Sequence, residues 1–243
     1  MSIYQNKKFD GEFQLMCPVI EKAIHGVIFD MDGVLCDSEP FICEAGRKML
    51  AERYGLNTKA EDFVPFTGTG EDSYLSGPAG KYGCRIKLPE DKERTYEIYL
   101  QIIKGRLKPL AGVKDFIIEC RAKKIKLAVA TSADEVKMKG NLHEIGIHSG
   151  SFDALVCGNE VALKKPNPDI FLFAAGKLGL SAENCLVIED SPSGLKAAKS
   201  AGMRALGLTT SFKEDLLKSA GADWTAPDFA RLPGVFPLAC PNT

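Results

Sequence analysis

Paired carboxylates follow two apolar runs of this sequence. Asp30 and Asp32 follow GVIF in the stretch GVIFDMDGVLCDS, and Glu189 and Asp190 follow CLVI in CLVIEDSPSG. In extended backbone, residues i and i+2 point to the same side, so Asp30 and Asp32 can face one crevice together. Two carboxylates at the end of a buried strand are costly unless they are paired or bound to a cation. Both pairs are therefore candidates for a cation-binding site.

Each carboxylate pair also has an ordinary structural interpretation. DMDG can be an acidic turn, and Glu189 and Asp190 can simply be solvated at a strand tip. A calcium-binding loop does not fit the first pair. Counted from Asp30, the glycine falls at position 4 instead of 6, and position 12 is Phe41 instead of glutamate. A decision between these interpretations depends on whether further polar residues follow the neighbouring strands.

Two more polar side chains occupy such places. Thr131 ends the run AVAT, and Lys165 lies in LKKPNPDIF, where Pro168 and Asp169 suit the start of a helix. Taken alone, Thr131 is typical of a β-branched residue that closes a strand, and the lysine pair is typical of a solvated loop. Together with the carboxylate pairs, however, they place polar groups after four successive strand or strand-loop units.

The runs that carry these residues alternate with helical stretches. Apolar runs typical of strands buried on both faces lie at 27–29, 127–131, 154–157, 186–188 and 205–208, and helices are expected near 112–123, 134–145, 168–179 and 193–201. This alternation predicts an α/β fold with a doubly wound (Rossmann-like) parallel sheet. Ligands bind outside the carboxyl ends of the strands in such a sheet, so the polar residues should meet at one edge.

Residues 39–108 interrupt this alternation after the first strand. They contain one helix candidate with Ile42, Ala45 and Met49 on one face and a second at 90–104. Between them, the glycine- and proline-rich stretch PFTGTGEDSYLSGPAGKYG predicts a loop, a short helix and another loop. We therefore predict a core domain of residues 21–38 and 109–243, with a small helical domain of residues 39–108 inserted after strand 1.

Bulk composition limits the possible partners. The chain has 243 residues and a formal net charge of -1, which gives no electrostatic footprint for nucleic acid, and no apolar run is long enough for a membrane span. Its 8 cysteines are scattered without a CxxC pair, and we see no secretory signal, so a cytoplasmic location is expected. Cys36 could be redox-active, but burial as a small apolar residue is favoured. We expect a monomer, since nothing in the sequence indicates oligomerisation.

The four motifs DMDGVL, VAT, KKPNPDIF and VIEDSPSG occur in an order that resembles the haloacid dehalogenase-like (HAD) hydrolases. The resemblance covers residues 24 to 230. Within that superfamily, the chain is most similar to the β-phosphoglucomutase-like phosphatases. It implies that the helical insert is a C1-type cap domain. It also implies a hydrolase that acts on a small phosphorylated metabolite, a sugar-phosphate-like monoester, with Mg²⁺ as cofactor.

The resemblance implies a role for each motif residue. Asp30 would attack phosphorus and become an aspartyl-phosphate, and Asp32 would protonate the leaving oxygen and later activate water. Thr131 would hydrogen-bond the transferring phosphoryl group. Lys165 would pair with that group and with Asp30; it is chosen over Lys164 because it directly precedes the proline of the motif.

The same resemblance implies the residues that bind Mg²⁺ and the substrate. The metal would be held by Asp30, the backbone carbonyl of Asp32, Asp190 and Glu189, since Mg²⁺ prefers oxygen ligands. The substrate would be bound by residues after strand 2 and in the cap loop: Ser132, Gly68, Thr69 and Glu71.

The cap residues of this chain differ from those of the mutases in this group, which leaves alternative functions to weigh. The mutases of this group carry a histidine where this chain has Ile42, and an arginine that clamps a second phosphate where it has Glu71. A plain phosphatase is therefore favoured over a β-phosphoglucomutase-type mutase. A binding or regulatory module without turnover is the other alternative. Dehalogenation is disfavoured because it has no use for a metal, and GxxxxGK[ST] is absent, which excludes a P-loop kinase.

Overall fold

The computed structural model describes residues 23–68 and 70–232. Residue Thr69 of the predicted substrate site lies outside the described residues, as do residues 21–22 and 233–243 of the predicted core domain. Within the described ranges, no helix combines the length and the apolar character that crossing a membrane requires.

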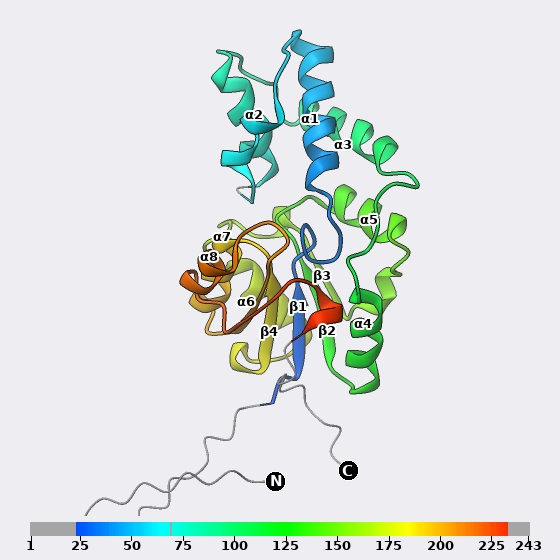
Figure 1. The fold of residues 1–243 in the computed structure, drawn as a ribbon, viewed down its shortest axis with the longest axis vertical. Helices are drawn as coiled ribbons and strands as arrows, with labels where there is room; N and C mark the ends of the chain where they lie inside the picture. The colour runs from blue at the N-terminus through cyan, green and yellow to red at the C-terminus, as the bar shows by residue number, and fades with distance from the viewer. Residues whose placement is uncertain (1–22, 69, 233–243) are drawn as a thin grey trace, which may run out of the picture.

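A six-stranded parallel sheet forms the lower part of the molecule (Figure 1). Its strand order is β3-β2-β1-β4-β5-β6. The bounds are Gly26–Phe29 (β1), Lys126–Ala130 (β2), Ala154–Val156 (β3), Cys185–Glu189 (β4), Arg204–Leu208 (β5) and Trp224–Ala226 (β6). All five neighbouring pairs are parallel, and Phe29 at the end of β1 is in register with Val129 and Ile188. The predicted doubly wound α/β fold is confirmed.

Five helices flank the sheet: α4 (Val113–Ala122), α5 (Glu135–Glu144), α6 (Asp169–Leu178), α7 (Pro192–Ser200) and α8 (Glu214–Ser219). Val27 and Phe29 of β1 pack on one face with residues of α4 and α5, whereas Ile28 packs on the other face with α6, α7 and α8. Successive side chains of β1 thus enter opposite apolar layers, as expected for a strand buried on both faces.

Two elements were absent from the prediction. Strand β6, of sequence WTA, is only partly buried and carries no continuous apolar run. Helix α8 has six residues, fewer than two turns, so neither element shows a clear hydrophobic pattern. The helix expected near 193–201 is found as α7 (Pro192–Ser200). Pro192 is its first residue, and the Ser191 side chain accepts a hydrogen bond from the Gly194 amide as an N-cap does.

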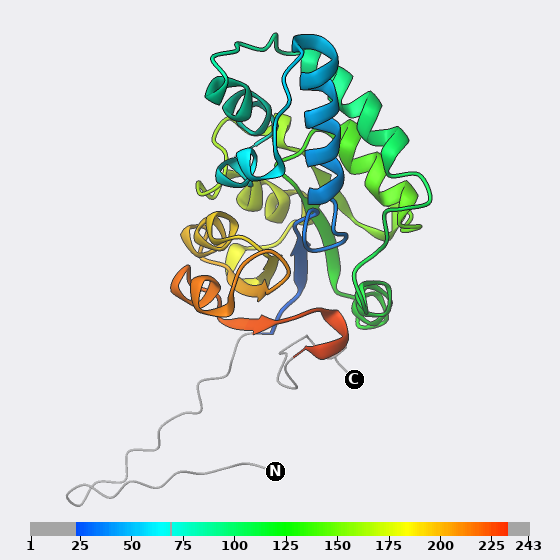
Figure 2. The same cartoon turned by 45° about the horizontal axis from the view of Figure 1, so that its top comes forward.

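The helices of the insert lie beyond the carboxyl ends of the strands (Figures 1 and 2). They are α1 (Glu39–Tyr54), α2 (Glu71–Lys81) and α3 (Glu90–Ile102). Helices α1 and α3 pack together, and α3 also contacts α5 of the sheet layer. We call residues 39–108 the cap; the division of the chain at its two ends stays a prediction.

Candidate active site

Strand β1 delivers Asp30 to the carboxyl edge of the sheet. The Asp30 amide donates to the Ile188 carbonyl at 2.9 Å, which extends the pairing of β1 with β4 by one residue. The chain then turns at Gly33, whose φ of 73° favours glycine. A Cβ at Gly33 would lie 1.9 Å from Oδ2 of Asp190, so this position also needs glycine for space. The two acidic motifs are therefore in direct contact.

Lys165 joins the two strands that carry the acidic motifs. Its Nζ lies 2.5 Å from Oδ1 of Asp30 and 2.7 Å from Oε1 of Glu189, and all three side chains are buried. Burial alone lowers the pKa of Lys165, but Asp30 and Glu189 raise it above its usual value, so the lysine stays charged. Lys164 instead donates to backbone carbonyls of its own loop, those of Gly158 and Val161.

Glu189 holds the turn from β4 into α7. Its Oε2 accepts hydrogen bonds from the amides of Asp190 and Ser191 and from the Ser191 hydroxyl, at 2.8 to 2.9 Å. A Cβ at Gly194 would lie 1.8 Å from Oε1 of Glu189, so that glycine lets α7 approach the carboxylate. Both oxygens of Glu189 are thus engaged, one by Lys165 and one by the turn.

The cluster carries more negative charge than its lysine balances. Burial has the largest effect on the pKa of Asp30 and raises it. Lys165 lowers this pKa, Glu189 and Asp32 raise it, and the net result is a pKa of about 7. Burial, with Glu189 and Asp30, also raises the pKa of Asp190 well above its usual value, although Ser211 donates a hydrogen bond to Asp190. Lys165 pairs with Asp30 and Glu189, whereas the buried Asp190 forms no ion pair among the described residues, so the excess negative charge is costly without another cation.

These residues fit Mg²⁺ in chemistry, although no three acidic, histidine or cysteine side chains of the described residues are arranged as a finished metal site. The donors are oxygens, which Mg²⁺ prefers, and a divalent cation would balance the excess charge. Because Glu189 is engaged by Lys165 and amides, Asp30 and Asp190 are the carboxylates best suited to hold the ion. The predicted ligand role of Glu189 and of the Asp32 carbonyl stays a prediction.

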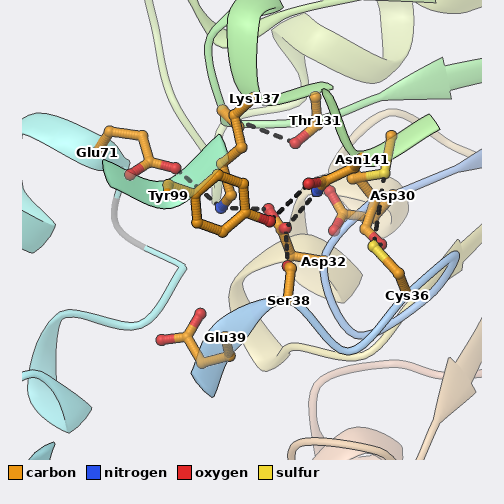
Figure 3. Close-up of polar contacts among 12 residues, drawn as sticks. Asp30, Asp32, Cys36, Ser38, Glu39, Glu71, Tyr99, Thr131, Lys137 and Asn141 are labelled. Carbon is orange, nitrogen blue, oxygen red and sulfur yellow. Dashed lines mark hydrogen bonds and ion pairs between the residues drawn. The ribbon is translucent and has the colours of Figure 1, made fainter. Parts of the chain in front are cut away.

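Asp32 has different partners from Asp30. Its carboxylate accepts from Ser38, which precedes α1, and its Oδ2 lies 3.1 Å from Nζ of Lys137 on α5 (Figure 3). Asn141, one turn further along α5, reaches Oδ1 at 3.5 Å. The Asp32 side chain is also more exposed, at 24% against 10% for Asp30. Asp32 is therefore directed toward the cap side of the site.

The predicted phosphoryl- and substrate-binding residues fall into three groups. Thr131 is fully buried, and its hydroxyl accepts from the Ala133 amide at 3.1 Å, which shapes the loop after β2. Ser132, Gly68 and Glu71 line a pocket of ≈ 70 Å³ together with Asp30, Asp32, Lys165, Glu189 and Asp190. Thr69 lies outside the described residues. The structure therefore brings the acidic motifs, Lys165 and the described cap residues to one cavity, whereas the predicted phosphoryl-binding residue Thr131 does not line it.

Lys137, Asn141, Tyr99, Ser38 and Ser211 are polar residues of the site that the sequence prediction missed. Two of them left a detectable signal. Lys137 and Asn141 are four residues apart and directly adjoin Met138 and Leu142, the buried positions of α5, so they fall on its core-facing side. Polar residues at such positions need partners, which in this fold are Asp32, Glu71 and Tyr99.

Cys36 is buried next to Met31, and burial and the Asp32 charge raise its pKa well above the usual value. Burial and a raised pKa both disfavour the reactive thiolate. The favoured interpretation, a small apolar core residue, is confirmed.

The comparisons with known proteins agree with this geometry. A family model described as haloacid dehalogenase-like hydrolase matches residues 27–208. The chain is 39% identical over 215 residues to Protein SUPPRESSOR OF QUENCHING 1, chloroplastic, of Arabidopsis thaliana, a match that covers 86% of this chain and 20% of that protein. The chain therefore spans about a fifth of the length of that relative.

Two further matches extend over nearly the whole of the other protein. Phosphorylated carbohydrates phosphatase of Thermotoga maritima is 35% identical over 201 residues, with 82% of this chain and 92% of that protein covered. The crystal structure of CbbY from Rhodobacter sphaeroides in complex with phosphate matches with a TM-score of 0.73 and 28% identity, covering 85% of this chain and 95% of that one.

Proposed function

Because the chain belongs to the haloacid dehalogenase-like hydrolase family, we propose that it hydrolyses a small sugar-phosphate-like monoester through an aspartyl-phosphate on Asp30, with Mg²⁺ as cofactor. The predictions of the family and of a phosphoric monoester hydrolase are confirmed by the family match and by the named phosphatases among its relatives. One observation carries the finer proposal: Asp30 is buried against Lys165 beneath a pocket that the cap residue Glu71 also lines.

The residues divide the chemistry between them. An Asp30 carboxylate oxygen forms a bond to phosphorus as the bond to the leaving oxygen breaks, and Asp32 gives that oxygen its proton. Asp32 then takes a proton from water as the water attacks the phosphorus of phospho-Asp30, which releases inorganic phosphate and restores Asp30. Lys165 offsets the charge of the phosphoryl oxygens throughout, next to the nucleophile.

Mg²⁺, held by Asp30 and Asp190, would neutralise charge on the phosphoryl group and orient it. The chain's own contribution is to hold those carboxylates in place. Lys165 and the turn amides fix Glu189, the Ser211 hydroxyl fixes Asp190, and Gly33 lets the two acidic segments approach closely.

The pocket supports a small substrate whose far end donates hydrogen bonds. Its volume of ≈ 70 Å³ is well below the roughly 300–1,000 Å³ of sites for larger ligands, so the cap must move for a sugar phosphate to enter. Glu39 and Glu71 line the cap side of the pocket. Carboxylates there suit sugar hydroxyls, and the name Phosphorylated carbohydrates phosphatase of a relative supports the same substrate class.

The proposal is tested by Asp30→Asn, which keeps the side-chain shape and removes the charge. We expect phosphate release from p-nitrophenyl phosphate and from a panel of sugar monophosphates to fall by at least about 10³-fold, because the nucleophile is lost. Asp37→Asn is the matched control, since Asp37 is an exposed aspartate of the same loop, and it should keep wild-type activity.

Chelation tests the metal in the same assay. EDTA should abolish turnover and Mg²⁺ should restore it, while Asp190→Asn should raise the Mg²⁺ concentration needed for half-maximal activity. Turnover by Asp30→Asn above about a tenth of the wild-type rate would disprove the nucleophile assignment. A wild-type protein that hydrolyses no member of the panel with Mg²⁺ would favour the binding-module alternative.

A further inference from the structure

Lys137 is a buried lysine that joins the cap to the acid–base residue. It lies on α5 of the core, is 2% exposed, and its Nζ is 3.0 Å from Oε1 of Glu71 and 3.1 Å from Oδ2 of Asp32. Figure 3 shows its ammonium group between the two carboxylates and beside the ring of Tyr99, whose centroid is 5.8 Å away. Burial alone lowers the pKa of Lys137, but Asp32 and Glu71 raise it well above its usual value.

A second contact runs from the cap to Asp32 by a parallel route. Tyr99 of cap helix α3 donates from its hydroxyl to Oδ1 of Asn141 at 2.5 Å, and the amide of Asn141 lies 3.5 Å from Oδ1 of Asp32. Lys137 and Asn141 are four residues apart on α5, which places them on the same side of the helix. Lys137 and Asn141 on one face of α5 therefore connect two cap side chains to the two carboxylate oxygens of Asp32.

We propose that Lys137 is a positioning residue for Asp32, and that Glu71 makes this positioning depend on the cap being closed. Glu71 is the first residue of α2 and reaches Lys137 only from the cap side of the pocket. When the cap opens, Lys137 loses one of its two carboxylate partners and Asn141 loses Tyr99. Asp32 is then free to turn away from the leaving oxygen until closure restores both relays.

This coupling links substrate capture to chemistry. The pocket is too small to admit a sugar phosphate with the cap in place, so opening precedes binding. An acid–base residue that is aligned only in the closed form acts when bulk water has been excluded. The contacts of Lys137 with Asp32 and Glu71 are strong enough to couple cap closure to the position of Asp32, because the loss of one partner leaves an uncompensated charge in the interior.

The proposal rests on the proposed function and is tested by the dependence of the rate on the leaving group. Nitrophenolate leaves without a proton, whereas a sugar alkoxide needs the proton of Asp32. We expect Lys137→Met to lower kcat/KM about 100-fold for the sugar monophosphate that the wild type hydrolyses fastest, but less than about 10-fold for p-nitrophenyl phosphate. Lys137→Arg should recover part of the loss, since it restores a cation.

Glu71→Gln tests the cap half of the relay. We expect about a 10-fold loss of kcat/KM with the sugar monophosphate, a smaller loss with p-nitrophenyl phosphate, and no further loss when Glu71→Gln is added to Lys137→Met. Lys139→Met is the matched control, because Lys139 lies on the same helix, is 63% exposed and pairs with Glu135 of that helix. It should behave as wild type with both substrates.

The activity with p-nitrophenyl phosphate also reports that each variant is folded. Equal losses of Lys137→Met with both substrates would indicate a structural role and overturn the proposal, as would unchanged activity with both. Additive losses in the double variant would overturn the coupling to Glu71. Failure of the proposed function is distinguishable, since the wild type would then hydrolyse neither substrate.

Discussion

Asp30 and Asp32 are the same residue type two positions apart, yet their surroundings give them different properties. Asp30 is buried beside Asp190 and Glu189 and shares Lys165 with Glu189. Asp32 is directed toward Ser38, Lys137 and the pocket. A nucleophile held near a cation site and an acid–base group held near the leaving oxygen need these two environments, which the alternation of extended backbone provides.

The raised pKa of Asp30 predicts how the stability of the metal-free protein depends on pH. The folded state raises this pKa from 3.8 to about 7, so between these values the folded protein keeps a proton that the unfolded chain releases. The free energy of unfolding therefore falls as the pH rises from about 4 to 7. Above pH 7 the ionisation of Asp30 causes no further loss. We expect the Tm of EDTA-treated wild type to fall between pH 4 and 7 more steeply than that of Asp30→Asn.

Mg²⁺ should reduce this fall, because it binds the ionised cluster of the folded protein. Asp37→Asn is the control and should retain the wild-type slope, since Asp37 is exposed. Parallel melting curves for wild type and Asp30→Asn across the whole window would show that Asp30 does not titrate in this way.

Helix α5 is the element through which the cap contacts the core. Its N-cap residue Asp134 pairs with Lys92 of α3 at 2.9 Å, Lys137 and Asn141 relay contacts to Asp32, and Gly140 allows α3 to approach. A Cβ at Gly140 would lie 2.3 Å from Cδ2 of Leu100 on α3. Helix α5 thus has a small residue where α3 packs against it and polar residues where it contacts Asp32 and the cap side chains.

Enlarging Gly140 should therefore weaken cap docking. We expect Gly140→Leu to lower the free energy of unfolding in urea by about 1–3 kcal/mol through overpacking against Leu100, and to lower kcat/KM for sugar monophosphates. Gly176→Leu on α6 is the matched control, because nothing lies within 4 Å of the added Cβ. It should be neutral or stabilising by up to ~1 kcal/mol, since glycine is a poor helix former. A Gly140→Leu protein as stable and active as Gly176→Leu would contradict close packing of α3 on α5.

At the scale of the whole molecule, the cap covers the sheet edge and limits what the site can accept. Lys137 and Lys165 are the cations among the described pocket residues, and both are paired with carboxylates. Three cap cations could otherwise clamp a second phosphate, but Lys81, Arg85 and Arg94 are not among the residues that line the described pocket. Lys81 pairs with Asp62, and Arg94 pairs with Glu52 and Glu97. Glu71 is likewise not a free charge, since Lys137 neutralises it.

A phosphosugar mutase must hold a bisphosphate and would need such a clamp. We therefore expect net hydrolysis and negligible conversion of β-glucose 1-phosphate to glucose 6-phosphate. The measurement uses enzyme, Mg²⁺ and a trace of the 1,6-bisphosphate, with glucose 6-phosphate followed by a coupled dehydrogenase and phosphate release followed in parallel. Rapid formation of glucose 6-phosphate without phosphate release would establish the mutase instead. The cytoplasmic location and the monomeric state also remain predictions at this scale.

Five of the six described strands, four of the five described helices that flank the sheet, and the residues at the strand ends could be found in the sequence. Hydrophobic periodicity is a local property, so β1, β2 and β4 and the polar groups that follow them could be found without coordinates. Their meeting at one edge followed from the rule that parallel strands share a carboxyl edge. Strand β6 was missed because it is only partly buried and lacks an apolar run, and α8 was missed because it spans fewer than two helical turns.

The side chains that the carboxylates face could be identified from the folded chain and not from the sequence. Lys137 and Asp32 are 105 residues apart, Lys137 and Glu71 are 66 apart, and Tyr99 and Asn141 are 42 apart. A helical lysine is usually solvated, and no local pattern states that α2 and α3 will close over α5. The closure removes water from these groups, and the cost of burying a charge without a partner then selects the ion pairs that form.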